Sequence, residues 1–508
     1  MTIQKNGRNM RPLLASGGTL ALVAFLGWLG GSSVAAAAAP TLSLSPAGNH
    51  PASTATVGAK GFAAGSAIDL YFDTTDEALA VTNGKGNFSK IQIQVPASAL
   101  PGTHWITAVA RNTGVAVQKP FLVSTDWSQF HESVQRQGHN PYENVLSTDN
   151  VSGLDIDWKA KTGVGLGSSP AVLNGVVYVG SQDSKLYAFN ANTGALRWKA
   201  TTGGPIYSSP AVVNNVVYIG SYDGKLYAFN ANTGALLWSA ATGGFIYSSP
   251  AVTASGVVYV GSFDDKLYAY NAATGVLKWS VTTADNGTIY TAPAVANGVV
   301  YVGTESGSFY AYNASTGAPL WSVSGLVTVN SSPSVANGVV YFGSDNANLY
   351  AYNAITGGLR WSATAGSAIG GTPAVANNTV YVGDTEGDLY AYNATTGALR
   401  WTAALGAALN SSPVVANGVL YIGCYDGSIY AYDASSGAQL WSSATGAYIY
   451  ASPAVVNGIL YEGSEDGKLS AYELNGGRNA IYKRNMKPPS LHGLRPNWQL
   501  TAVQGLPE

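Results

Sequence analysis

Acidic side chains recur once per repeat through the second part of the chain, and their spacing raises the question of a metal site. The same turn position is filled by Asp183, Asp223, Asp264, Ser306, Asn346, Glu386, Asp426 and Asp466. A calcium site needs several oxygen ligands that converge on one point, whereas one acid per repeat is spread around a fold. Asp and Asn also hydrogen-bond the backbone of tight turns. We therefore predict turn residues here and no metal site.

Other residue types that carry chemistry are sparse. His131 and His139 lie eight residues apart without carboxylates in register, which matches no zinc-ligand spacing. Cys424 is the only cysteine, so no intrachain disulfide can form, and the Cys-x-x-Cys-His motif of an attached haem is absent. From these groups we predict no catalytic residue.

A more informative position lies three residues before a proline that recurs in every repeat. It reads Gly167, Tyr207, Tyr247, Tyr290, Asn330, Gly370, Asn410 and Tyr450. The residue before it is always aliphatic, and because strand side chains alternate between two faces, the variable set faces away from that packing. We predict that these side chains ring the mouth of a central channel and form a binding surface, carried by Tyr207, Tyr247, Tyr290, Asn330, Asn410 and Tyr450. The alternative is that the tyrosines only plug the channel.

The elements that position these residues belong to a repeat marked by eight tryptophans at intervals of 40 to 42 residues: Trp158, Trp198, Trp238, Trp279, Trp321, Trp361, Trp401 and Trp441. Each repeat holds four short apolar runs separated by turn signals such as Asn-Gly and Asp-Gly, which favour hairpins. Four antiparallel strands per repeat of this length are typical of a propeller blade. Residues 154–160 have no repeat before them, and the eighth repeat lacks a tryptophan strand. We predict eight blades, with residues 154–160 closing the ring.

One recurring sequence motif indicates a protein family. Ala-Tyr/Phe-Asn/Asp-Ala-x-Thr/Ser-Gly-x-x-x-Trp occurs seven times, for example from Ala188 to Trp198 and from Ala431 to Trp441. It resembles the tryptophan-docking repeat of the pyrroloquinoline quinone (PQQ)-binding-like β-propellers, over residues 126–477. The resemblance implies that each tryptophan packs against the neighbouring blade, beside the glycine of its own turn. It also implies one of two functions: oxidation of alcohols or sugars with PQQ and Ca²⁺, or protein binding without catalysis, as in the outer-membrane barrel-assembly lipoprotein.

The residues favour the second function. The large alcohol dehydrogenases of this family stack the quinone between a tryptophan and a disulfide of adjacent cysteines, and Cys424 alone cannot supply one. The repeat spacing also leaves no room for long loops between blades. We expect a non-catalytic binding or scaffold protein without a cofactor; the alternatives are an atypical PQQ- and Ca²⁺-dependent oxidoreductase and a purely structural spacer.

The rest of the chain suggests an exported protein. Residues 1–39 combine a basic start, an apolar stretch and a run of alanines, as in a cleaved signal peptide; an uncleaved anchor is the alternative. Residues 40–125 predict a small immunoglobulin-like β-sandwich, 126–155 a lead-in segment, 156–477 the eight-bladed propeller and 478–508 a tail, either flexible or packed as an outer strand. A net charge of −2 and only 10% charged residues argue against a nucleic-acid partner. We expect a secreted or surface-associated monomer that binds a protein or a cell-envelope polymer.

Overall fold

The computed structural model of the chain describes residues 39–477, 487–491, 494, 496 and 502–504. The predicted signal peptide, residues 1–39, lies outside the described residues apart from its last position. Among the described residues, none of the helices has the length and apolar character needed to span a membrane. The helices whose bounds lie within those residues are the single 3-10 turns η1 (Val151–Gly153) and η2 (Asn475–Gly477).

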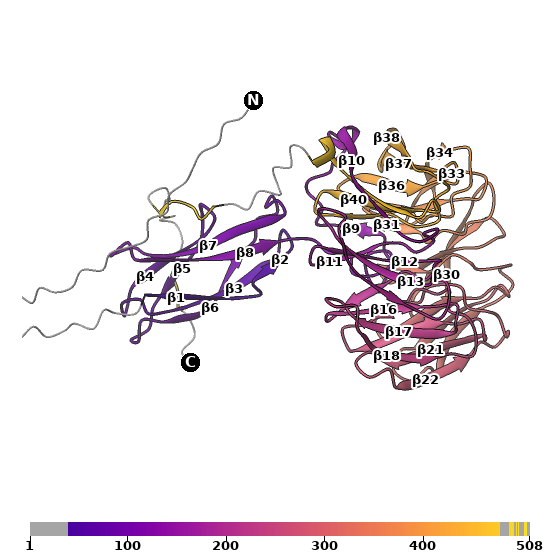
Figure 1. Cartoon of the computed structure of the whole chain (residues 1–508), viewed down its shortest axis with the longest axis horizontal. Helices are drawn as coiled ribbons and strands as arrows, with labels where there is room; N and C mark the ends of the chain where they lie inside the picture. Colours follow the sequence, from indigo (N-terminus) through magenta and orange to yellow (C-terminus); the bar gives the residue numbers. More distant parts are fainter. Residues whose placement is uncertain (1–38, 478–486, 492–493, 495, 497–501, 505–508) are drawn as a thin grey trace, which may run out of the picture. The chain divides into compact units, whose positions relative to one another are not determined.

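Residues 41–123 form two sheets that enclose one apolar core (Figure 1). One sheet has the order β1-β3-β6 and the other the order β2-β8-β7-β4-β5-β42, in which β42 (Ala502–Gln504) comes from the tail of the chain. The strands are β1 (Thr41–Ser45), β2 (Gly48–Asn49), β3 (Thr54–Lys60), β4 (Ala67–Phe72), β5 (Thr75–Val81), β6 (Phe88–Gln94), β7 (Gly102–Ala110) and β8 (Ala116–Val123). Alternating apolar residues such as Ile91 and Ile93 of β6 point into the core. The sheets form a sandwich, and its likeness to immunoglobulin modules stays a prediction.

Most of the predicted tail, residues 478–508, lies outside the described residues. Its described part includes β42 (Ala502–Gln504), which pairs in parallel with β5 at the edge of the larger sandwich sheet. This segment therefore is a strand added to a sheet edge, which satisfies backbone groups that would otherwise be unpaired.

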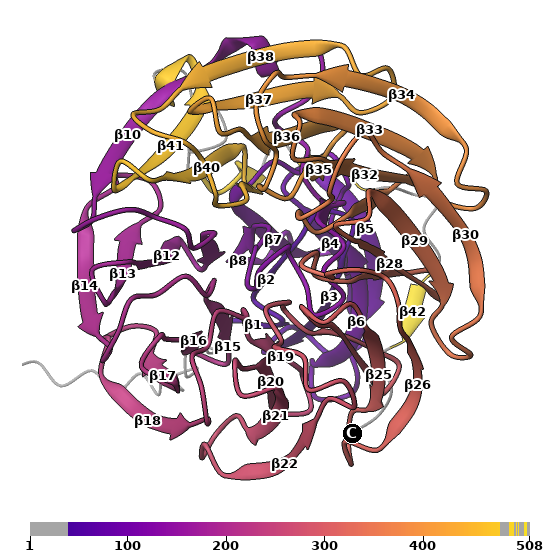
Figure 2. The same cartoon turned by 90° about the vertical axis from the view of Figure 1, so that its right-hand side faces the viewer.

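Residues 154–474 form the propeller, and their strand pairing gives eight four-stranded blades arranged around a centre (Figure 2). Blade 1 consists of β11 (Ala171–Leu173), β12 (Val176–Ser181), β13 (Lys185–Asn190) and β14 (Leu196–Thr201), and blade 2 of β15 (Ala211–Val213), β16 (Val216–Gly220), β17 (Lys225–Asn230) and β18 (Leu236–Ala241). Blade 3 consists of β19 (Ala251–Val252), β20 (Val257–Gly261), β21 (Lys266–Asn271) and β22 (Leu277–Thr282), and blade 4 of β23 (Ala294–Ala296), β24 (Val299–Gly303), β25 (Phe309–Asn313) and β26 (Pro319–Val323).

Blades 5 to 7 repeat this pattern. Blade 5 consists of β27 (Ser334–Ala336), β28 (Val339–Gly343), β29 (Asn348–Asn353) and β30 (Leu359–Thr364). Blade 6 consists of β31 (Ala374–Ala376), β32 (Thr379–Gly383), β33 (Asp388–Asn393) and β34 (Leu399–Ala404), and blade 7 of β35 (Val414–Ala416), β36 (Val419–Gly423), β37 (Ser428–Asp433) and β38 (Gln439–Ala444). Blade 8 takes β39 (Ala454–Val456), β40 (Ile459–Ser464) and β41 (Lys468–Leu474) from the end of the repeat region and β10 (Leu154–Lys161) from its beginning. The strand that carries Trp158 thus closes the ring and leaves no open sheet edge between the two ends.

Each repeat tryptophan contacts the next blade. The indole Nε1 of Trp198 in blade 1 donates a hydrogen bond to the carbonyl of Ala231 in blade 2, at 2.9 Å. A Cβ on Gly234, in the turn of blade 2, would lie 2.6 Å from the Trp198 ring. The expectation that the glycine belongs to the same turn as its tryptophan is therefore wrong. The tryptophan strand follows its own turn, but the indole crosses to the following blade and meets the glycine there.

A second aromatic set reaches the same acceptors. The hydroxyl of Tyr178 donates to Ala231 O at 3.1 Å, so one alanine carbonyl receives both Tyr178 and Trp198. The pattern holds at the ring closure, where Tyr461 and Trp158 both donate to Ala191 O. At the junction of blades 7 and 8 the Ala-containing turn is replaced by β10. There Trp441 donates to Leu154 O instead, and the buried hydroxyl of Tyr421 has no partner in the part of the chain that the structure describes.

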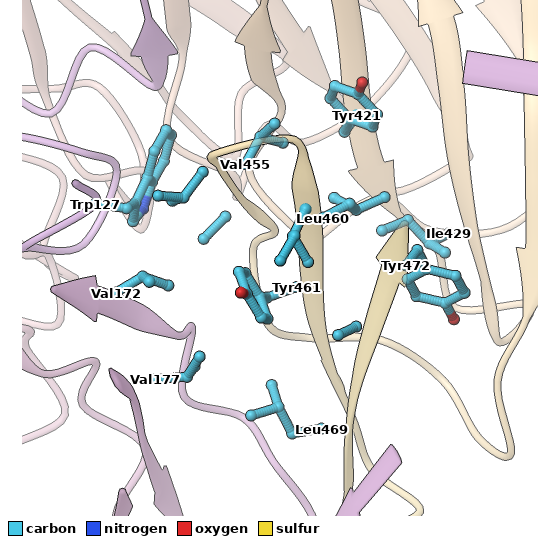
Figure 3. Close-up of a cluster of buried hydrophobic side chains, with 14 of the residues drawn as sticks. Trp127, Val172, Val177, Tyr421, Ile429, Val455, Leu460, Tyr461, Leu469 and Tyr472 are labelled. Carbon is cyan, nitrogen blue, oxygen red and sulfur yellow. The ribbon is translucent and has the colours of Figure 1, made fainter. Parts of the chain in front are cut away.

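The lead-in segment passes along the inner strands of all eight blades. Backbone N–H groups of Val172, Val212, Val252, Val295, Val335, Val375 and Val415 donate to oxygens of Trp127, Ser128, Gln129, Val134, Gln135, Gln137 and Gly138, and Asn140 Nδ2 donates to Val455 O. Its strand β9 (His139–Asn140) also pairs in parallel with β35. Figure 3 shows the apolar core at the closure, where Trp127 and Val172 lie with Val455 and Tyr461. The segment satisfies inner-strand donors that otherwise face the central channel.

Candidate functional site

A cavity of about 490 Å³ lies at one end of the channel. All eight positions of the variable set line it: Gly167, Tyr207, Tyr247, Tyr290, Asn330, Gly370, Asn410 and Tyr450. The aliphatic residues before them, such as Ile206 and Ile246, are fully buried between blades. Strand alternation thus brings together residues that are about 40 positions apart in sequence, and their role in binding stays a prediction.

We call the end of the propeller that contains this cavity the cavity face. In each blade it is formed by the residues that lead into the first strand and by the turn between the second and third strands. Backbone hydrogen bonds join the two segments, as between Tyr222 N–H and Pro205 O and between Glu305 N–H and Thr288 O. Side chains of both segments therefore share one surface.

A belt of serines holds the cavity wall together. Ser169 N–H donates to Ser209 Oγ at 3.0 Å, and Ser209 N–H donates to Ser249 Oγ at 2.9 Å. The bond from Ser452 N–H to Ser169 Oγ, at 2.8 Å, crosses from the last blade to the first. Ala292 lacks a hydroxyl and interrupts the belt. The small residue that follows each variable residue by two positions therefore connects neighbouring blades.

Aromatic side chains occupy one arc of the cavity face; they come from blades 7 and 8 and from blades 2 to 4, and blade 1 between them contributes none. Tyr207 stacks on Tyr247 at 5.5 Å between ring centroids, and Tyr247 meets Tyr290 edge to face at 5.8 Å. The arc is extended by Tyr222, Phe245, Phe263, Tyr425 and Tyr448, all within stacking or edge distance of a neighbour. Burial raises the pKa of Tyr222 to about 12, so its hydroxyl is a neutral donor at physiological pH. The sequence pattern located the first ring of this arc but not the turn residues that extend it.

The opposite arc, in blades 4 to 7, is polar and acidic. Glu305, Asp345, Asn330 and Asn410 line the cavity there, and Asp345 Oδ2 accepts a long hydrogen bond of 3.4 Å from Asn330 Nδ2. Desolvation raises the pKa of Asp345 above its ordinary value. The cavity lining contains no Lys or Arg. Its two halves therefore differ in chemistry, which a purely repeating sequence would not produce.

Phe130 of the lead-in also lines the cavity, and it is held by buried polar groups. The Arg136 guanidinium lies 5.2 Å from the Phe130 ring centroid and donates to the carbonyls of Phe130, Pro250 and Pro293. Both nitrogens of buried His131 contact carbonyl oxygens, those of Arg136 and Pro413. Desolvation lowers the pKa of His131 to about 4. Sequence reasoning missed Phe130 and Arg136, because no repeat or motif marks them.

The repeated turn acids do not point to one centre. Asp183 and Asp426 each accept a hydrogen bond from the tyrosine of their own hairpin, Tyr187 and Tyr430. Lys185 pairs with Asp183 as well, at 2.9 Å. No group of three or more His, Cys, Asp or Glu side chains converges as metal ligands within the described residues. These acids hold their turns, as Asp does in such loops.

Comparison with known proteins identifies the fold family. The family described as outer membrane protein assembly factor BamB matches residues 143–245, 240–368 and 349–483, well over half of the chain. The chain belongs to this family. No curated protein matches the sequence.

Solved structures agree on the fold. BamB from Moraxella catarrhalis is 20% identical with a TM-score of 0.56, over 63% of this chain and 99% of that one. The quinohemoprotein alcohol dehydrogenase ADHIIG from Pseudomonas putida HK5 is 17% identical with a TM-score of 0.61, over 73% of this chain and 82% of that one. The computationally designed protein Ika8 is 18% identical with a TM-score of 0.57, over 62% and 97%. An outer membrane protein assembly factor, an alcohol dehydrogenase and a designed protein share this scaffold, so function must be argued from the site.

Proposed function

We propose that this protein is an exported, non-catalytic binding platform that engages a protein or a cell-envelope polymer through the cavity face. The observation that carries the proposal is where the blades differ. Blade cores repeat the same aliphatic, Trp and Tyr residues, whereas the eight residues around the cavity range from Gly to Asn to Tyr. Sequence differences among near-identical repeats concentrate where they change a surface and leave the scaffold intact.

The chemistry of the cavity supports binding over quinone-dependent oxidation. PQQ carries three carboxylates, and the cavity presents Glu305 and Asp345 without a lining Lys or Arg. Its lining also lacks the tryptophan and the paired cysteines between which the family's alcohol dehydrogenases hold the quinone, since Cys424 is a single buried thiol. The residues present do not fit this cofactor.

Site-specific photo-cross-linking tests the platform. Benzoylphenylalanine at position 450 replaces a tyrosine that is 41% exposed on the cavity face. The control is position 355, which is 73% exposed in the turn at the other end of blade 5. We expect defined adducts with envelope components from position 450 and none of these from position 355. Equal adducts at both positions, or none at 450, would contradict the proposal.

A second measurement addresses the enzymatic alternative directly. Purified protein is incubated with PQQ and Ca²⁺, and its melting temperature and its reduction of a dye with alcohols or sugars are recorded. We expect neither a shift nor turnover. A shift accompanied by dye reduction would replace the platform with a quinoprotein oxidoreductase.

A further inference from the structure

The charges of the cavity face are distributed unevenly between its two arcs. The first residue of the third strand is lysine in blades 1, 2, 3 and 8, on the side of the aromatic arc: Lys185, Lys225, Lys266 and Lys468. The same position is Ser308, Asn348, Asp388 and Ser428 in blades 4 to 7, near or at the start of each third strand. Positive side chains are therefore missing from the turns of the acidic arc.

The carboxylates next to the cavity are not neutralised. Glu305 and Asp345 are exposed, and neither forms an ion pair with Lys or Arg within the described part of the chain. Across the cavity, both carboxylate oxygens of Glu465 accept hydrogen bonds from the neutral amide of Gln182, at 2.9 and 2.8 Å. Three lysines of the same face, Lys185, Lys266 and Lys468, pair with the aspartates of their own turns. The fourth, Lys225, does not line the cavity. The cavity thus carries net negative charge.

The tyrosines add to this preference. Tyrosine ring faces are electron-rich and attract ammonium and guanidinium groups, an effect that grows when the contact is shielded from water. Glu305 lies close enough to Tyr290 to raise the pKa of the tyrosine, although burial is the larger cause. Ring faces and uncompensated carboxylates therefore border the same cavity. A neutral sugar would also stack on tyrosines, but it would leave the carboxylates without a counter-charge.

From this arrangement we infer that the cavity face binds a polypeptide segment bearing lysine or arginine, with the cationic group between the tyrosine arc and the carboxylates Glu305 and Asp345. The inference rests on the proposed platform function and specifies its partner chemistry. The cavity volume of about 490 Å³ accommodates long basic side chains together with part of their backbone. Charge complementarity of this kind fixes specificity and speeds association.

The test uses the full chain and two short peptides, acetyl-Gly-Lys-Gly-Lys-Gly-amide and the same peptide with both lysines acetylated. Binding is measured by calorimetry at 50 and 500 mM NaCl. We expect the lysine peptide to bind, the acetylated peptide to lose at least about tenfold in affinity, and high salt to weaken binding. Cellotetraose serves as the neutral ligand.

Three variants locate the site. Glu305→Gln with Asp345→Asn removes two charges from the cavity, and we expect about a tenfold loss of affinity. Tyr247→Leu removes a ring but keeps an apolar side chain, and we expect a loss of about threefold to tenfold. The control, Asp149→Asn with Asp155→Asn, removes the same charge outside the cavity face. Asp155 lies opposite Glu473 in the β10–β41 ladder, at the end of blade 8 away from the cavity, and Asp149 lies in the lead-in. We expect no change in affinity for the control.

Any one of four results would overturn the inference. The first two are no binding of the lysine peptide and equal binding of the acetylated peptide. The other two are equal weakening of binding by the cavity and control variants, and binding of cellotetraose with an affinity that does not change when both carboxylates are removed. Cross-linking at position 450 then separates the two proposals. If cavity-face adducts persist while the lysine peptide fails, the platform stands and its ligand is not cationic. If both fail, the platform is refuted as well.

Discussion

Glu462 is the residue whose replacement we expect to stabilise the protein. It lies in β40 opposite Ser470, and the equivalent residue in the other blades is aliphatic or Phe, opposite a tyrosine. Its side chain is fully buried; Oε1 accepts a bond from Gly463 N–H, while Oε2 has no partner among the described residues. Burial raises the pKa of Glu462 well above its ordinary value, which favours the protonated form of this side chain in the native protein. Blade 8 therefore contains an unsatisfied polar group where other blades have apolar packing.

Glu462→Ile combined with Ala451→Ser introduces the pair that blade 2 has at these places: Ile219, which is fully buried, and Ser208, whose hydroxyl accepts the bond from Gly220 N–H. The serine replaces Glu462 Oε1 as the acceptor of Gly463 N–H. Removing one unsatisfied buried oxygen is worth about 1–3 kcal/mol, so we expect the free energy of unfolding of this Ile variant to exceed that of Glu462→Gln by about this amount. Glu462→Gln is the matched control, because it keeps the shape and the unsatisfied polar group but cannot ionise. We expect it to gain less than the Ile variant.

The pH dependence provides an independent check. Because the folded-state pKa is raised, the unfolded chain loses its proton first as the pH rises above about 4.5. Wild-type stability relative to Glu462→Gln is then highest below this pH and falls as the pH rises toward the folded-state pKa, by up to about 1.4 kcal/mol per pH unit. Denaturant unfolding followed by tryptophan fluorescence at pH 4, 5.5 and 7 measures both effects. An Ile variant that unfolds earlier than wild type, or identical pH profiles for wild type and Gln, would refute the reasoning.

Three further predictions concern the scaffold. Tyr341→Phe should lower the free energy of unfolding by about 0.5–1.5 kcal/mol because it deletes the bond to Ala394 O. Tyr421→Phe should not lower it, since the Tyr421 hydroxyl has no partner among the described residues. Equal losses in chemical unfolding would contradict this. Gly234→Ala should destabilise by about 1–3 kcal/mol more than Gly298→Ala. Both glycines have a positive φ, +71° and +78°, but only the Cβ at 234 would clash, with Trp198 at 2.6 Å, while the Cβ at 298 meets nothing within 4 Å; similar melting temperatures would exclude the clash. Acid should lower the free energy of unfolding between about pH 6.5 and 4, because His131 becomes protonated in the unfolded chain while the buried imidazole of the native state stays neutral. If a His131→Gln variant shows the same dependence of stability on pH in this range as wild type, this explanation is excluded.

The local sequence determined the blade. Positive-φ turns, the aliphatic position before each variable residue and the Trp and Tyr-x-Gly positions all act within one repeat or between neighbours, so periodicity alone predicts four-stranded blades and the strand that closes the ring. The variable set is predictable for the same reason, because strand alternation fixes which residues face the channel.

Tertiary structure decided what repetition cannot encode. The partner of each tryptophan except Trp441 is the glycine of the next blade, because the indole crosses the blade junction; the motif itself contains only the glycine of its own turn. Phe130 reaches the cavity, and Arg136 reaches the Phe130 ring, only because the lead-in follows the inner strands around the ring of blades, and no pattern marks these contacts. The division of the cavity face into an aromatic and an acidic arc exists only once the ring is closed, since closure places blade 8 beside blade 1 and brings residues hundreds of positions apart to one cavity.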